Sequence, residues 1–288
     1  MKLPHIPPFK TKVVEPIYFR SKEDRAAKIK EVNYNLFNIH SDWVIVDLMT
    51  DSGTGAMSEH QWAEVMLGDE SYAGSESYFK LKRSIKDILG FDFIAPTHQG
   101  RAAENILFSA VVKEGDVIPG NAHFDTTKGH IEFRKATALD CTIKAAYDTS
   151  VLHPFKGNID IDALDKAIQE YGKERIPFIN ITVTCNTVGG QPVSLQNIKA
   201  TCEIAKKYDI PVYMDIARFA ENAYFIKTRE EAYKDWTIED IVKEMFTDVS
   251  VVWMSSKKDG LVNIGGFIAL NDEPVSYTHL TLPTICSV

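Results

Sequence analysis

Residues 195–218, LQNIKATCEIAKKYDIPVYMDIAR, hold a helical pattern that is followed at once by a short apolar run. The apolar spacing predicts a helix over Leu195–Tyr208, and Val212–Met214 has the composition of a buried strand. A helix that leads into a strand through a short connection is typical of parallel sheets, which need a crossover between neighbouring strands. This stretch therefore predicts an α/β fold.

The same alternation begins near residue 58 and continues past this stretch. Helical spacing is present in four further segments: Ser77–Leu89, Ala102–Val112, Ile161–Tyr171 and Ile238–Phe246. Short apolar runs lie between them, at Phe91–Ala95, Val117–Pro119, Ile179–Thr184, Val249–Met254 and Phe267–Leu270. The pattern predicts a mostly parallel sheet with helices on both faces. Ligands bind beyond the carboxyl ends of the strands in such sheets, so the polar residues at those ends are the candidates for function.

The composition is that of a folded globular protein. The chain has 288 residues, enough for two domains of about 150 residues or one large α/β domain. Hydrophobic residues make up 44% and charged residues 25%, which excludes wholesale disorder. With a net charge of −8 and no basic stripe, neither nucleic acid nor a membrane surface is expected as a partner. No apolar run approaches the ~20 residues of a membrane helix.

The cytoplasm is the expected location. The N-terminus has neither the apolar core nor the small-residue cleavage site of a signal peptide. The four cysteines lack the spacing of a metal site, so they are expected to be reduced thiols. Cys141, Cys185 and Cys202 are expected to be small buried hydrophobes.

Three segments are expected along the chain. Residues 1–50 are polar, with a charged helix over Lys22–Val32 and a strand-like run at Trp43–Val46, and should form an arm and part of a small domain. Residues 51–273 carry the alternating pattern and should form the large domain. Residues 274–288 have no amphipathic period and are expected to be foreign to the fold, like read-through or a sequencing adapter.

Two predicted strands end in residues that suit one chemistry. Asp215 follows Val212–Met214, and the pair Lys257-Lys258 lies just after Val249–Met254. A pyridoxal phosphate enzyme requires a lysine amine that bonds the cofactor aldehyde and a carboxylate that keeps the pyridine nitrogen protonated. A positive neighbour lowers the pKa of a lysine and favours the free amine. Taken alone, a lysine pair after a strand is more typical of a solvated surface.

Two other strand ends supply an anion site and a hydrogen-bond donor. The run Thr97-His98-Gln99-Gly100-Arg101 follows a predicted strand and opens a helix, where free N–H groups and the helix dipole favour a phosphate. Asn186 follows Ile179–Thr184 and is placed to donate to a phenolate oxygen of the cofactor. Each feature alone also fits an ordinary turn. Together, the four strand ends supply an anion site, a donor, an acid and a lysine in chain order.

Six longer motifs carry a family resemblance. They are LMTDSGT (48–54), GDESYAGS (68–75), THQGR (97–101), GGQPVS (189–194), DIARFAENAYFIK (215–227) and KKD (257–259). Over residues 6–273 the chain resembles the β-eliminating lyases, the family of tryptophanase and tyrosine phenol-lyase. The resemblance implies an aminotransferase-like fold (fold type I) whose large domain, residues 51–273, binds pyridoxal 5'-phosphate. It also implies a potassium ion and a homotetramer, with an amino acid as substrate.

The resemblance implies roles for individual residues. Lys258 is the implied Schiff-base lysine and the base that removes the substrate α-proton, and Asp215 is the implied partner of the pyridine nitrogen. Phe124 is implied to stack on the cofactor ring, with Asn186 and Arg218 near its 3′ oxygen. The implied phosphate contacts are Ser52, Gln99, Gly100, Arg101, Ser255 and Lys257.

Other implied roles concern the substrate and a cation. Thr50 matches a contact to the substrate carboxylate, and Tyr72 matches the acid that protonates the leaving carbon. The implied potassium ligands are Gly53, Glu70 and Asn263. Asp125 follows Phe124, and an acid there suits an indole N–H, whereas a carboxylate would repel a developing phenolate. Asp125 therefore favours tryptophan as substrate, giving indole, pyruvate and ammonia.

Alternatives remain at this point. The segment 256–266 is closer to tyrosine phenol-lyase, which releases phenol from tyrosine. An aminotransferase on the same fold is disfavoured by Tyr72 and by the matched potassium positions. Family members run far longer, and their C-terminal segment supplies the arginine for the substrate carboxylate. A truncated chain that binds the cofactor but does not turn over is therefore a third possibility.

Overall fold

The computed structural model describes residues 16–47, 49–50, 52 and 57–271 of the chain. The chain separates into two compact units, residues 1–51 and 52–288. In the first, the helix α1 (Lys22–Glu31) begins at Ser21, whose side chain accepts from the main-chain N–H of Asp24. None of the helices in the described ranges is long and apolar enough to cross a membrane.

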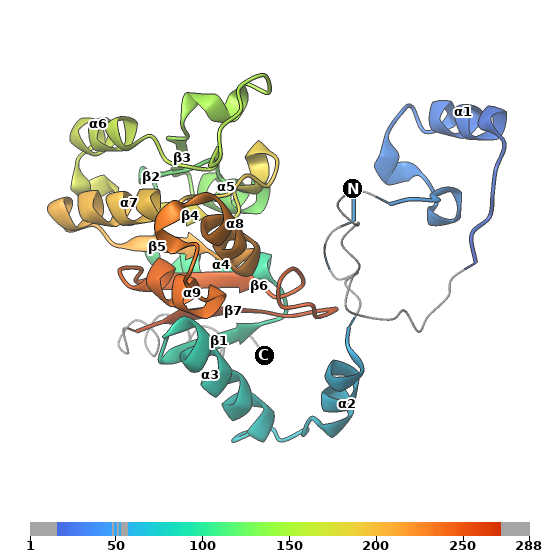
Figure 1. Ribbon diagram of the computed structural model, residues 1–288, viewed down its shortest axis with the longest axis horizontal. Coiled ribbons are helices and arrows are strands. Elements are labelled where there is room, and N and C mark those ends of the chain that lie inside the picture. Colours follow the sequence, from blue (N-terminus) through green and yellow to red (C-terminus); the bar gives the residue numbers. More distant parts are fainter. Residues whose placement is uncertain (1–15, 48, 51, 53–56, 272–288) are drawn as a thin grey trace. The chain divides into compact units, whose positions relative to one another are not determined.

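A seven-stranded sheet forms the second unit, in the order β1-β7-β6-β5-β4-β2-β3 (Figure 1). Five neighbouring strands are parallel, as expected for strands separated by helices. Their bounds are Val117–Gly120 (β2), Thr137–Asp140 (β3), Ile179–Thr182 (β4), Val212–Asp215 (β5) and Val251–Ser255 (β6). The carboxyl ends of these five strands therefore lie along one edge of the sheet.

The remaining two strands lie at one edge of the sheet, and the hydrophobic pattern did not predict their antiparallel direction. β7 (Gly266–Leu270) runs antiparallel to both β6 and β1 (Phe93–Thr97). In the register, Gly266 pairs with both Ser255 and Thr97. A Cβ at Gly266 would lie 2.7 Å from the carbonyl carbon of Gln99. A glycine at this position lets the chain pass close to the start of the next helix.

Helices cover both faces of the sheet. Leu107 and Phe108 of α4 and Ile131 of α5 pack with Trp253 on one face. The helices of that face are α4 (Gly100–Val111) and α5 (Asp125–Phe133). The other face carries a larger apolar cluster. Its helices are α3 (Glu76–Leu89), α6 (Ile161–Tyr171), α7 (Leu195–Tyr208), α8 (Phe219–Arg229) and α9 (Ile238–Phe246).

Most of the expected elements are present, with a few differences. The strand expected at Trp43–Val46 is wrong, because Ser41–Trp43 is a 3₁₀ turn and residues 44–46 form no strand. The elements α2 (Glu59–Leu67), α5, β3 and α8 lie where no element was predicted. Cys141, Cys185 and Cys202 are free and buried, which confirms the expectation for them.

Candidate active site

The carboxyl ends of β5 and β6 bring an acid and a lysine to one edge of the sheet. Asp215 is the last residue of β5, and Lys258 lies in the turn that follows β6. The Lys258 Nζ atom lies 3.2 Å from the hydroxyl oxygen of Ser255 and 3.4 Å from that of Ser52. Two hydroxyls thus hold the amine beside the strand end.

Asp215 is a buried carboxyl with a strongly raised pKa. Its side chain accepts a hydrogen bond of 3.0 Å from the main-chain N–H of Ala217. Burial, followed by the charge of Glu104, raises the pKa of Asp215 to about 7, although the charge of Lys258 opposes this rise. A cationic partner would stabilise the ionised carboxylate, as a protonated ring nitrogen does.

Lys258 shows the opposite shift. Burial lowers the pKa of its amine, and the charges of Arg218, Lys257 and Arg101 lower it further, against an opposing effect of Asp215. A lysine with a lowered pKa holds more of its amine in the free, nucleophilic form. The lowering of the Lys258 pKa by its neighbour Lys257 is the effect that the sequence predicted for the lysine pair.

The N-terminus of α4 lies against the end of β6. Gln99 precedes the helix, and its side chain makes no capping hydrogen bond. A Cβ at Gly100 would lie 2.7 Å from the Cβ of Ser255, so only glycine allows this close approach. Lys257 Nζ lies 3.3 Å from the Gln99 side-chain oxygen. Helix N–H groups, a hydroxyl and a lysine thus converge where a phosphate would be held.

Three further residues follow strands along the same edge. Asn186 opens a 3₁₀ turn, Asn186–Val188, after β4. Arg218 precedes α8, and its main-chain N–H donates to the carbonyl of Val183 at 3.1 Å. Phe124 immediately precedes α5 and is half-buried. These three residues therefore lie where their side chains could surround a flat ring bound at the strand ends.

The hydrogen bonds described above for the site do not involve the other residues that the sequence predicted for it. Thr50 belongs to the first unit, and Gly53 lies outside the described residues. Glu70 and Asn263 are exposed in loops, and Tyr72 is fully exposed. Asp125 is the exposed first residue of α5. Within the described ranges, no group of three or more His, Cys, Asp or Glu side chains is placed to hold a metal ion.

Two residues near the site escaped the sequence analysis. Glu104 is only 2% exposed, and its carboxylate accepts a 2.6 Å hydrogen bond from the Thr127 hydroxyl. An acid among apolar residues one turn into the helix after Gly100 was the available signal. Asp259 accepts from the main-chain N–H groups of Ala220 and Glu221 and so caps α8 from a distant loop. No local sequence pattern reveals such a contact.

The donor set fits pyridoxal phosphate. The uncapped start of α4 with Lys257 offers an anion site, and the half-buried Lys258 offers a free amine. Asp215 is a buried carboxyl with a raised pKa, so a nearby cation would be needed to stabilise its ionised form. Phosphate, aldehyde and pyridine nitrogen are the three groups that the cofactor presents to these partners.

Known proteins with similar sequences fall in one family. The family described as "Beta-eliminating lyase" matches residues 47–282. A "Probable beta-eliminating lyase" of Trichomonas vaginalis is 60% identical over 269 residues, covering 93% of this chain and 58% of that protein. A tryptophanase of Salinibacter ruber is 52% identical, covering 93% of this chain and 57% of its own length. A tyrosine phenol-lyase of Clostridium tetani is 50% identical, with 92% and 58% covered. The chain thus spans about three fifths of the length of these relatives.

Solved structures share the fold at low identity. Cystalysin from Treponema denticola, whose crystal structure contains pyridoxal 5'-phosphate, matches with a TM-score of 0.59 and 15% identity. The match covers 96% of this chain and 68% of cystalysin. The likeness confirms the aminotransferase-like α/β class that the sequence predicted.

Proposed function

We propose that this chain, which belongs to the β-eliminating lyase family, is the cofactor-binding part of a pyridoxal phosphate-dependent lyase acting on an aromatic amino acid. One observation carries the proposal. Asp215 and Lys258 lie at the ends of adjacent parallel strands, where burial shifts their pKa values in opposite directions. A buried acid and a half-buried amine with opposite pKa shifts are the arrangement that this cofactor chemistry requires.

The start of α4 is proposed to bind the cofactor phosphate. The N–H groups of its first turn would donate to the phosphate oxygens together with Ser255 and Lys257. The proximity of Gly100 to Ser255 supports this assignment, because it brings the helix N-terminus and the end of β6 to the same point. Gln99, Arg101 and Ser52 are the further contacts proposed here.

Asp215 and Lys258 would divide the acid and base work. Bound pyridoxal phosphate supplies an electron sink for the charge left when the α-proton of an amino acid is removed. Asp215 would hold the proton on the pyridine nitrogen, which its burial and main-chain contact position it to do. Lys258 would bind the cofactor covalently and, once released, accept the α-proton at Nζ. Arg218 and Asn186 would donate to the 3′ oxygen.

Tyr72 is proposed to protonate the carbon of the leaving group. Its side chain is fully exposed in this chain. Such a role therefore requires another part of the assembled protein to bring Tyr72 to the ring, or the ring's site to Tyr72. Thr50 is proposed as the contact to the substrate carboxylate.

Tryptophan is the proposed substrate, cleaved with uptake of water to indole, pyruvate and ammonia. Asp125 supports this choice, since it lies next to Phe124 and is exposed, so its carboxylate is available to accept from an indole N–H. Tyrosine is the second candidate, because a tyrosine phenol-lyase is about as similar to the chain as a tryptophanase is.

Three proposals rest on the family resemblance. Two of them are a potassium ion held by Gly53, Glu70 and Asn263 and a homotetramer of the full-length protein, and the third, the activity itself, is given above. A cytoplasmic location is proposed separately, from cysteines whose spacing is typical of reduced thiols. We also propose that residues 51–273 form the large domain, that residues 1–50 contribute an arm and part of a small domain, and that residues 274–288 are foreign to the fold. Residues 272–288 lie outside the described part of the chain.

Substrate competition on the full-length protein tests the proposed activity. Tryptophan and tyrosine are offered together, and indole and phenol are measured with pyruvate. Indole with stoichiometric pyruvate is the expected result. Phenol as the main product would transfer the assignment to the second candidate. Amino-group transfer to an added keto acid, without pyruvate release, would contradict both.

A further inference from the structure

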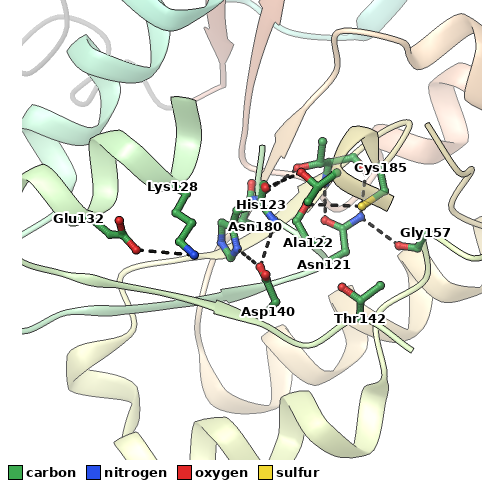
Figure 2. Close-up of polar contacts among 12 residues, drawn as sticks. Asn121, Ala122, His123, Lys128, Glu132, Asp140, Thr142, Gly157, Asn180 and Cys185 are labelled. Atoms are coloured by element: carbon green, nitrogen blue, oxygen red, sulfur yellow. Dashed lines mark hydrogen bonds and ion pairs between the residues drawn. The ribbon is translucent and has the colours of Figure 1, made fainter. Parts of the chain in front are cut away.

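A hydrogen-bonded clamp surrounds His123, the residue before Phe124. The Asp140 carboxylate oxygen Oδ1 accepts two hydrogen bonds from His123, one of 3.0 Å from the main-chain N–H and one of 2.7 Å from ring Nδ1 (Figure 2). The Thr187 hydroxyl donates to the His123 carbonyl at 2.7 Å. We call these three residues, His123, Asp140 and Thr187, the His123 clamp.

The clamp joins three strand ends. Asp140 is the last residue of β3, and His123 lies in the connection between β2 and α5. The pairing of Gly120 with Asp140 in the two parallel strands brings this connection beside the carboxylate. Thr187 belongs to the turn after β4, next to Asn186. The clamp therefore fixes the main chain before Phe124 from both sides.

The residues before His123 are fixed as well. The Asn121 side chain donates to the carbonyls of Gly157 and Thr182, and it accepts from the Thr182 N–H at 2.8 Å. The Cys185 thiol lies 3.4 Å from the carbonyl of Ala122. Residues 121–123 thus enter α5 with little freedom, and Phe124 is the first residue beyond these contacts.

The His123 ring is wholly buried, yet only one of its nitrogens is used. The side chain of His123 is 0% exposed, and its Nε2 atom has no hydrogen-bond partner in the described part of the chain. An ionised carboxylate can only accept, so the bond to Asp140 requires that Nδ1 carry a proton and donate it. The bonds from His123 outweigh the effect of burial and keep the pKa of Asp140 below its usual value. The hydrogen bond to Asp140 is therefore the polar contact that the His123 ring makes.

We propose that His123 and Asp140 are positioning residues that fix Phe124 against the ring of the bound cofactor. The inference rests on the proposed function, together with the stacking of Phe124 on that ring that the family resemblance implies. A stacking side chain contributes only when its plane is held parallel to its partner, and a displacement of about 1 Å weakens such a contact strongly. Residues that hold a binding group through hydrogen bonds commonly decide how well it works.

The experiment is a double-mutant cycle on the chain with pyridoxal 5'-phosphate as the probe. Asp140→Ala removes both bonds to His123, and it is made alone and together with Phe124→Leu. The matched control is Asp148→Ala, since Asp148 accepts from Ser150 in a loop away from this clamp. The dissociation constant is measured by fluorescence titration, and the circular dichroism of the cofactor absorbance band reports how the ring is held.

We expect Asp140→Ala to weaken cofactor binding about tenfold or more and to change the dichroism of the bound cofactor. In the Phe124→Leu background the same substitution is expected to weaken binding less than about twofold, because the residue on which it acts is gone. His123→Asn, which keeps a donor at the Nδ1 position, should bind the cofactor better than His123→Leu. Asp148→Ala should bind it as the unaltered chain does.

Equal weakening by Asp140→Ala in both backgrounds would overturn the inference, because a purely structural contact does not act through Phe124. Equal binding by the Asn and Leu variants of His123 would overturn it too. If the unaltered chain itself fails to bind the cofactor, the proposed function fails and the inference with it. Failure of the proposed function is therefore recognised from the unaltered chain alone, whereas failure of the inference is recognised from the variants.

Discussion

The charge of Glu104 raises the pKa of Asp215, although the two carboxyl groups come from elements far apart in sequence. Glu104 lies on the buried face of α4, and Asp215 ends β5, where it is paired in register with Trp253 of β6. Because registered side chains of neighbouring strands share one face of the sheet, Asp215 lies on the face that α4 covers. When one of these two buried acids is ionised, its charge disfavours ionisation of the other.

Replacing Glu104 with glutamine should lower the pKa of Asp215. The amide keeps an acceptor for the Thr127 hydroxyl but removes the neighbouring charge. In the chain without cofactor, the Asp215 titration is expected to move from about 7 toward its ordinary value. Carboxyl-carbon NMR measures this, with the exposed Glu114→Gln as the control. An unchanged titration would show that Glu104 is already uncharged near pH 7.

Asp215 should make the chain without cofactor less stable as the pH rises. Folding raises the pKa of Asp215 from 3.8 to about 7, so the folded state binds more protons than the unfolded state between these values. The free energy of unfolding is therefore expected to fall by on the order of 4 kcal/mol as the pH rises through this window. Asp215→Asn should make the fall smaller and leave the part that other buried acids with raised pKa values, such as Glu104 and Asp259, contribute.

Denaturant unfolding at a series of pH values measures this linkage. Asp148→Asn is the control, since hydrogen bonds from Ser150 lower the pKa of Asp148, and its contribution is instead lost as the pH falls. A fall that keeps its full size in Asp215→Asn would place its origin in other groups.

Tyr72→Phe should slow release of indole more than it slows exchange of the substrate α-proton. The assigned protonation of the leaving carbon follows proton removal, and a positioned acid contributes about 10²–10⁴-fold. Thiolate leaving groups need less protonation, so S-alkyl cysteines should be spared in the full-length protein. Equal loss of kcat on tryptophan and on an S-alkyl cysteine would remove Tyr72 from this role.

Asp125→Thr should lower kcat/KM for tryptophan relative to an S-alkyl cysteine. A site that bonds one polar group of its substrate discriminates by up to ~10⁴–10⁵ when the pairing is complete. The alternative is that Asp125 only stabilises the start of α5, which its place in the first turn also suits. That role predicts the same loss on every substrate, so an unchanged ratio would make Asp125 structural.

Much of the fold was predictable because its elements are locally encoded. The helices Ile161–Tyr171, Leu195–Tyr208 and Ile238–Phe246 have the bounds that apolar spacing predicted. In contrast, α8 buries the polar Asn222 beside its apolar residues and begins at a cap supplied by the distant Asp259, which no local pattern reveals. The direction of β7 is likewise set by its neighbours, not by its own residues.

The site was predictable where function needs a residue type at a strand end. Asp215 and Lys258 meet this condition: Asp215 ends β5, and Lys258 lies in the turn after the adjacent strand β6. Glu104 and Asp140 act through contacts between distant segments, which a single sequence does not encode. Potassium and substrate contacts came only from resemblance, and Glu70, Tyr72 and Asn263 lie exposed here.

Reduction of the chain with borohydride in the presence of pyridoxal 5'-phosphate, followed by peptide mapping, tests the central claim most directly. The lowered pKa of Lys258 and its place beside Ser255 predict that the reduced cofactor is bound to this lysine. Lys257, one residue away, is the internal control. Cofactor on Lys258 alone is the predicted result. Cofactor on Lys257, or spread over surface lysines with none on Lys258, would contradict the account.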